Sequence, residues 1–112
     1  MVELFDSLEK ETVDNFKGGK GKCTLIKVND KPSNINVYAK IIVHPHSSIG
    51  RHEHINDAEI IYCLEGCGKV YDNGTYKLLK PGMVNVCLKG PHELINDSDE
   101  DLVIIANVVK EN

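Results

Sequence analysis

Short apolar runs, separated by turn-forming residues, recur along the chain between residues 23 and 109. Numerous short strand-like runs divided by turns are the pattern of a β-sandwich or β-barrel. The pattern therefore predicts an all-β fold. The expected strands are 23–28, 37–43, 59–64, 69–71, 76–79, 83–88, 92–95 and 102–109.

Two parts of this pattern are more specific. Residues 72–75 read Asp-Asn-Gly-Thr, and the Asn-Gly pair supplies the positive φ angles that a tight type I′ hairpin turn needs. Residues 102–109 are almost continuously apolar, which favours a strand covered on both faces. We therefore expect a hairpin at 72–75 and a buried strand at the end of the domain.

The segment before residue 23 lacks the strand pattern, and a short helical stretch is expected within residues 1–16. Residues 17–22 form a basic, glycine-rich loop without the spacing or the final Ser or Thr of a phosphate-binding P-loop. We interpret this loop as a solvated connector. The chain is accordingly divided into an N-terminal segment with this loop, 1–22, and a β-barrel domain, 23–112.

Composition limits the possible partners. At 112 residues and 12.5 kDa the chain has room for one domain with a single core. A formal net charge of -4 without a basic cluster argues against nucleic acid as a partner. The N-terminus is acidic where a signal peptide is basic, and no apolar run is long enough for a bilayer. These features predict a cytoplasmic protein without a membrane partner.

The four cysteines, Cys23, Cys63, Cys67 and Cys87, include no C-x-x-C pair. Three of them lie in strand-like runs, which predicts buried free thiols in a reducing compartment. Cys63 has the same strand parity as Glu59, so the two side chains are expected on one side of the strand.

One group of polar residues indicates a divalent metal site. His52 and His54 are separated by one residue, so on a strand both imidazoles point to the same side. Glu59 opens the expected strand 59–64 and can bring its carboxylate alongside, and His92 follows downstream. Nitrogen and oxygen ligands suit Fe, Mn, Ni, Zn or Cu. Four protein ligands leave open positions only on a five- or six-coordinate metal, which favours iron or manganese for catalysis.

These residues resemble the first motif of the cupin family, G-x5-H-x-H-x3-4-E-x6-G. His52, His54, Glu59 and Gly66 fall in register with its last four named positions, whereas its opening glycine falls on His46.

The second cupin motif, G-x5-P-x-G-x2-H-x3-N, is looser in this chain. Gly74, Pro81-Gly82, His92 and Asn96 supply its parts with altered spacing, and the His-x3-Asn ending is intact. Met83 stands where an aspartate often follows the Pro-Gly pair. The resemblance extends from about residue 37 to residue 109.

The resemblance implies a double-stranded β-helix, or jelly-roll, barrel with a short irregular or helical N-terminal segment. It also implies that His52, His54, Glu59 and His92 bind a divalent transition metal, with Fe, Mn, Zn and Ni as the candidates. Small cupins commonly form dimers, so a homodimer is expected. A small barrel leaves a cavity for one small ligand, and a small-molecule partner is therefore expected too.

Tyr38, Lys40 and Asn85 are further candidates for the pocket if their strands have the expected register. His44 and His46 flank Pro45 at an expected turn, and we interpret both as exposed residues rather than ligands.

Two functions remain open at this point. The first is a metal-dependent enzyme on a small metabolite, of the dioxygenase, decarboxylase, isomerase or lyase type. The second is a non-catalytic protein that binds or senses a small ligand. The complete ligand set favours the enzyme, because a pure binder does not need open coordination positions. The sequence assigns no catalytic residue beyond the ligands and no organic cofactor.

Overall fold

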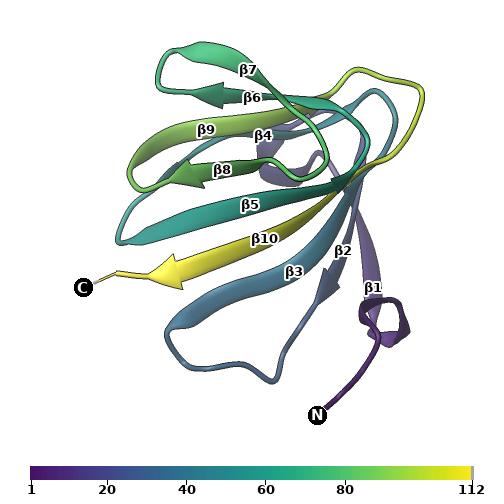
Figure 1. Ribbon diagram of the computed structural model, residues 1–112, viewed down its shortest axis with the longest axis vertical. Coiled ribbons are helices and arrows are strands. Elements are labelled where there is room, and N and C mark those ends of the chain that lie inside the picture. Colours follow the sequence, from purple (N-terminus) through teal and green to yellow (C-terminus); the bar gives the residue numbers. More distant parts are fainter. Residues whose placement is uncertain (112) are drawn as a thin grey trace.

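The computed structural model describes residues 1–111, which form ten β-strands in two antiparallel sheets and two short 3-10 turns (Figure 1). The larger sheet has the order β1 (Lys10–Asp14), β2 (Lys22–Lys27), β3 (Ile35–Val43), β10 (Leu102–Lys110), β5 (Asp57–Glu65) and β8 (Val84–Cys87). The smaller sheet has the order β4 (Ser47–His54), β9 (Gly90–Asn96), β6 (Gly68–Asp72) and β7 (Thr75–Leu79).

The expected all-β fold is confirmed, and every strand that the apolar pattern predicts is present. Two strands lie outside that pattern. β1 has one half-buried position, Val13, and pairs with β2 at the edge of the larger sheet. β4 begins with two serines, and only its His-Glu-His end was expected to be a strand. An edge strand that contacts the core at one residue leaves no alternating pattern in the sequence.

The β6–β7 hairpin has the predicted turn. Its central residues, Asn73 and Gly74, have φ angles of 52° and 92°. Both values are positive, as a type I′ turn requires. The turn aligns Tyr71 with Tyr76 across the hairpin, and their rings meet edge to face with centroids 5.4 Å apart.

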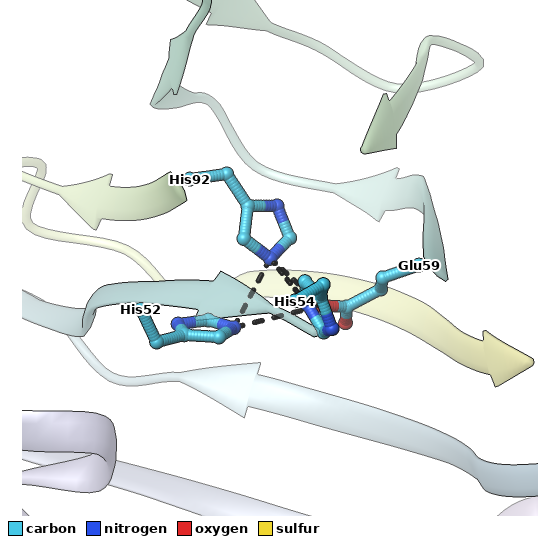
Figure 2. Close-up of side chains that lie close together, drawn as sticks. All are labelled: His52, His54, Glu59 and His92. Atoms are coloured by element: carbon cyan, nitrogen blue, oxygen red, sulfur yellow. Dashed lines mark hydrogen bonds and ion pairs between the residues drawn. The ribbon is translucent and has the colours of Figure 1, made fainter. Parts of the chain in front are cut away.

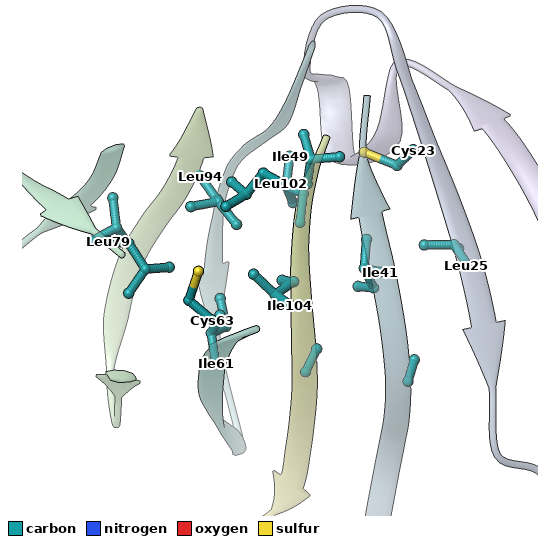
Figure 3. Packing of buried hydrophobic residues seen from close by; sticks show 14 residues of the cluster. Cys23, Leu25, Ile41, Ile49, Ile61, Cys63, Leu79, Leu94, Leu102 and Ile104 are labelled. Carbon is teal, nitrogen blue, oxygen red and sulfur yellow. The ribbon is translucent and has the colours of Figure 1, made fainter. Parts of the chain in front are cut away.

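The two sheets face each other across one hydrophobic core (Figure 3). β10 lies between β3 and β5, and its inward side chains Leu102, Ile104 and Ala106 are buried. On its other face Val103 is buried, whereas Ile105 and Asn107 are half-buried. The second face of β10 is therefore only partly covered, which corrects the expectation of a strand buried on both faces.

Three cysteines are buried free thiols, as predicted, whereas Cys67 between β5 and β6 is exposed. Burial raises the pKa of the Cys23 thiol to about 11. Burial is also the main cause of the raised pKa of Cys63 and Cys87. A raised pKa keeps a thiol protonated, so these three cysteines are unreactive at neutral pH.

The N-terminal segment lies against the outer face of β3. The turn η1 (Phe5–Ser7) is the expected short helical stretch. The Phe5 ring stacks on Tyr38 with centroids 6.0 Å apart, and Lys40 Nζ lies 2.9 Å from an Asp6 carboxylate oxygen. Tyr38 and Lys40 therefore point away from the interior and are not pocket residues. No helix in the described part of the chain is long and apolar enough to span a membrane.

The glycine-rich loop is largely exposed, as expected of a solvated connector, but it also packs on β4. The turn η2 (Phe16–Gly18) contacts β4. A Cβ atom on Gly50 would overlap the Lys17 carbonyl oxygen, and a Cβ atom on Gly19 would overlap the Ser48 carbonyl oxygen. The two backbones approach this closely because both positions are glycine. Hydrogen bonds between Ser48 and Lys20 hold the loop in place.

Candidate metal centre

Four side chains from three strands converge between the two sheets (Figure 2). His52 and His54 alternate with Glu53 at the end of β4, so both imidazoles point inward. His92 of β9 is paired with His52 across the smaller sheet, and Glu59 reaches the same point from β5 of the larger sheet. The fold therefore brings together all four residues that the sequence singled out as metal ligands.

The ligand atoms of these side chains are close enough to share one ion. The Nε2 atom of His92 lies 2.9 Å from His54 Nε2 and 3.1 Å from His52 Nε2. Glu59 Oε1 lies 2.8 Å from the Nε2 atoms of His54 and His92, and 3.7 Å from that of His52. Two ligands that are each about 2.1 Å from a metal and at right angles would lie about 3 Å apart. The spacing fits a single five- or six-coordinate metal ion.

The second ring nitrogen, Nδ1, of each imidazole faces a hydrogen-bond acceptor. The acceptors are the Gly50 carbonyl oxygen for His52 at 2.7 Å, an Asp57 carboxylate oxygen for His54 at 2.8 Å, and Asn85 Oδ1 for His92 at 3.2 Å. In the tautomer with Nδ1 protonated, each imidazole donates to its acceptor and leaves the Nε2 lone pair free for a metal. Three lone pairs and a carboxylate then face one another, and a divalent cation would stabilise that arrangement.

The charge of Glu59 is maintained although its side chain is only 9% exposed. Burial is the largest single influence and raises its pKa. The hydrogen bonds and positive charge of the surrounding imidazoles together outweigh burial and lower the pKa to about 2. The pKa of His52 is raised. Burial again acts most strongly and lowers it, but the contacts with Glu59 and the Gly50 carbonyl together outweigh burial.

A cavity of about 390 Å³ opens beside the cluster. Small-molecule sites span roughly 300–1,000 Å³, so this cavity suits a small ligand. Its inner walls come from both sheets, and they include the apolar side chains of Leu25, Ile41, Ile49, Ile61, Leu94 and Val108. The four candidate ligands thus form the polar end of a largely apolar pocket.

The other residues that the sequence analysis considered for the pocket lie partly next to the site and partly away from it. Asn85 is buried next to the site, where it contacts His92. Cys63 shares the inward face of β5 with Glu59, but it belongs to the hydrophobic core and does not line the cavity. His46 is exposed and pairs with Asp99.

His44 is half-buried rather than exposed. Its Nε2 atom lies 2.7 Å from Thr24 Oγ1, away from the metal cluster. Asn96, from the end of the second motif, is also away from the cluster. Its buried amide donates to the backbone carbonyls of Val43 and Glu100 at 2.9 and 2.8 Å. Asn96 therefore ties together the ends of strands and has a structural role.

The sequence did not indicate three residues that shape the site. Gly50 and Asp57 hold His52 and His54 through their ring Nδ1 atoms. Phe16 lines the cavity, although it precedes the β-domain by several residues. The spacing of Asp57, three residues after His54, was the only local signal, and a single aspartate in a turn carries little information.

Comparisons with known proteins agree with the fold. The model of the cupin domain family, Cupin_2, matches residues 39–108. An oxalate-binding protein from Thermotoga maritima is 31% identical over 113 residues, which cover 97% of this chain and 93% of that protein.

Two solved structures illustrate the structural likeness. The crystal structure of a protein described as a predicted oxalate decarboxylase, from Thermotoga maritima, has a TM-score of 0.92 and 29% identity, and covers 98% of this chain and 99% of the other. A Klebsiella pneumoniae protein with a double-stranded β-helix domain has a TM-score of 0.72 and 18% identity, with 99% and 90% of the chains covered. The jelly-roll expectation is thereby confirmed.

Proposed function

The chain belongs to the cupin family, and from this premise we propose that it is a divalent-metal-binding cupin that holds a small carboxylate, such as oxalate, at the metal. The observation that carries the proposal is the convergence of three Nε2 atoms and one carboxylate at the polar end of a small apolar cavity. The names of two similar proteins, an oxalate-binding protein and a predicted oxalate decarboxylase, support this ligand class.

The metal would be held by His52, His54, Glu59 and His92. Iron and manganese are the first candidates, because both accept coordination beyond four protein ligands. Once bound, the metal would supply a Lewis acid to which carboxylate oxygens of the ligand attach. The protein contributes the oriented imidazoles, the ionised Glu59 and the apolar walls that limit the access of water.

Binding without turnover is the function that the pocket residues support best. Decarboxylation of oxalate to formate and carbon dioxide takes up one proton, so an enzyme needs an acid near the ligand. Among the acidic residues that line the cavity, Asp57 is bonded to His54, and Glu93 is bonded to Arg51 and Tyr76.

Besides Glu59, the remaining acidic residue of the lining is Glu53, which alternates with His52 and His54 along β4 and points away from the imidazoles. A metal-dependent decarboxylase remains the second candidate. Two points support this candidate. Catalysis needs open coordination positions on the metal more than binding alone does, and one similar protein is described as a predicted oxalate decarboxylase.

Calorimetric titration of oxalate into the metal-loaded protein and into the metal-free protein tests this proposal. We expect saturable binding that requires the metal and is lost in the His52→Ala variant. Formate and carbon dioxide are measured in the same solutions. Formate production would favour the decarboxylase, and the absence of binding in the loaded protein would contradict the proposed function.

We also propose a homodimer that forms through the outer face of the larger sheet. This face exposes the apolar side chains of Ile60, Tyr62, Val84, Val86 and Leu88. Asn107 lies on the same face, opposite Ile60. We propose separately that the protein is cytoplasmic, because its three buried free thiols are compatible with a reducing compartment.

A further inference from the structure

The turn η2 forms part of the wall of the metal pocket. Phe16 and Lys17 both line the cavity, although they precede the β-domain in sequence. The turn lies directly on Gly50, whose missing side chain leaves room for the Lys17 carbonyl. The carbonyl of Gly50 in turn accepts the hydrogen bond from His52 Nδ1 at 2.7 Å. The contact with Gly50 therefore links the turn η2 to the residue that holds the first candidate metal ligand.

Lys17 places a positive charge at the mouth of this pocket. Its side chain is exposed but lines the cavity, and its Nζ atom stands 5.6 Å from the centre of the Phe16 ring. No carboxylate within hydrogen-bonding or ion-pair distance of the Lys17 ammonium is present among residues 1–111.

We propose that Lys17 is a specificity-determining residue, whose ammonium group attracts the second negative charge of a small dicarboxylate dianion in the metal pocket. The inference rests on the proposed function, because the metal attracts the first charge. The inner walls are largely apolar, so a second carboxylate depends on the few polar and cationic residues of the lining. Lys27 is the other cation of the lining. It lies at the end of β2 that is remote from η2.

The dianion preference has a simple physical origin. A carboxylate that enters an apolar cavity loses hydration, and an unpaired charge there is costly. An ammonium group at the mouth offsets part of that cost for a dianion and contributes less for a monoanion of the same shape. Because Lys17 is exposed, water and salt screen the interaction, and the expected effect is about two- to five-fold in affinity.

The test compares oxalate with oxamate, in which one carboxylate is replaced by a carboxamide of similar size. Both are titrated calorimetrically into protein whose metal content has been measured. The variants are Lys17→Met, Lys17→Arg and Lys20→Met. Lys20 belongs to the same loop and is exposed, but it does not line the cavity. Methionine keeps the unbranched stem of lysine, so the positive φ of 55° at position 17 is equally strained in the variant.

We expect Lys17→Met to reduce the ratio of oxalate to oxamate affinity about two- to five-fold at unchanged metal content. Lys17→Arg and Lys20→Met should keep the wild-type ratio. An unchanged ratio in Lys17→Met, or an equal fall in Lys20→Met, would overturn the role of Lys17 while metal and oxalate binding still stood. Wild-type protein that holds no metal, or that holds metal and binds neither anion, would instead overturn the proposed function and this inference with it.

Discussion

The Asp57 carboxylate lies 2.8 Å from Nδ1 of His54, and this contact orients an imidazole whose Nε2 atom lies 2.8 Å from Glu59 Oε1 and 2.9 Å from His92 Nε2. Both residues stand where β4 ends and β5 begins, so a three-residue separation is enough to join them. Carboxylate partners of this kind hold the ring and raise the basicity of the nitrogen that binds the metal.

Replacement of Asp57 by alanine should weaken metal binding about 10- to 100-fold, because His54 loses its orientation and part of its basicity. The metal dissociation constant, measured by competition with a chelating dye, reports the effect. Asp99→Ala is the matched control, since Asp99 contacts His46 at 2.7 Å on the exposed surface. Equal weakening in both variants would refute a specific role for Asp57.

The proposed metal site of four residues predicts that one substitution among them removes the metal. His52→Ala removes the most exposed of the three imidazoles, 20% exposed, and should leave the fold intact while metal is lost. Elemental analysis of protein purified without added metal or chelator measures this directly. His46→Ala, at an exposed position away from the cluster, should keep the wild-type content. Full metal occupancy in His52→Ala would rule out the site described above.

Metal binding should depend on pH through the imidazoles and not through Glu59. Protons and the metal compete for the same Nε2 atoms, so affinity falls as the imidazoles protonate. The pKa of His52 is raised above its usual 6.5, so the loss begins above pH 6.5 as the pH falls. Glu59, with a pKa of about 2, remains ionised throughout this range.

The metal-free protein should show the opposite trend in this interval. A raised His52 pKa adds stability below pH 6.5, and this stability is lost as the pH rises through the raised pKa. A lowered Glu59 pKa adds stability above 4.5 that is lost only as the pH falls toward 2. The melting temperature of the metal-free protein should therefore be higher at pH 6 than at pH 8, and that of the loaded protein higher at pH 8. Parallel trends in the two forms would contradict this coupling.

Gly50→Ala should release the turn η2 from β4, because the new methyl group would overlap the Lys17 carbonyl and the backbone of Gly19. Overpacking of this kind costs about 1–3 kcal/mol in the free energy of unfolding. Hydrogen exchange at residues 16–20 should become faster. Gly74→Ala is the control, since it is strained by a φ of 92° but meets no atom within 4 Å. It should lower stability without faster exchange at η2, and equal exchange at η2 in both variants would argue against the contact.

The proposed dimer is tested at the centre of the exposed apolar face. Val86→Lys places a charge beside Ile60 and should convert a dimer into a monomer, because an unpaired charge in an apolar interface is costly. Sedimentation velocity measures the mass. Leu78→Lys, at an exposed position on the smaller sheet, should leave the dimer unchanged. A wild-type monomer at all accessible concentrations would exclude the interface.

The sequence by itself determined eight of the ten strands and the identity of the four converging side chains. Strands that bury one or both faces leave apolar runs, and the Asn73–Gly74 turn needs positive φ angles that few residue pairs adopt. The His52-x-His54 spacing guarantees a common side on any strand, so that part of the site is local. The position of Glu59 and His92 came from the family motif and not from local spacing.

Only the tertiary structure decided which residues around the four candidate ligands hold the imidazoles in place. Gly50, Asp57 and Asn85 act through contacts with imidazole Nδ1 atoms, and Asn85 comes from a different strand than the ring it holds. The turn η2 joins the pocket because two glycines let separate backbones meet, which no pattern within either segment reveals. Tyr38 and Lys40 were misplaced because period-two alternation assigns residues to two faces, but only packing decides which face is inside.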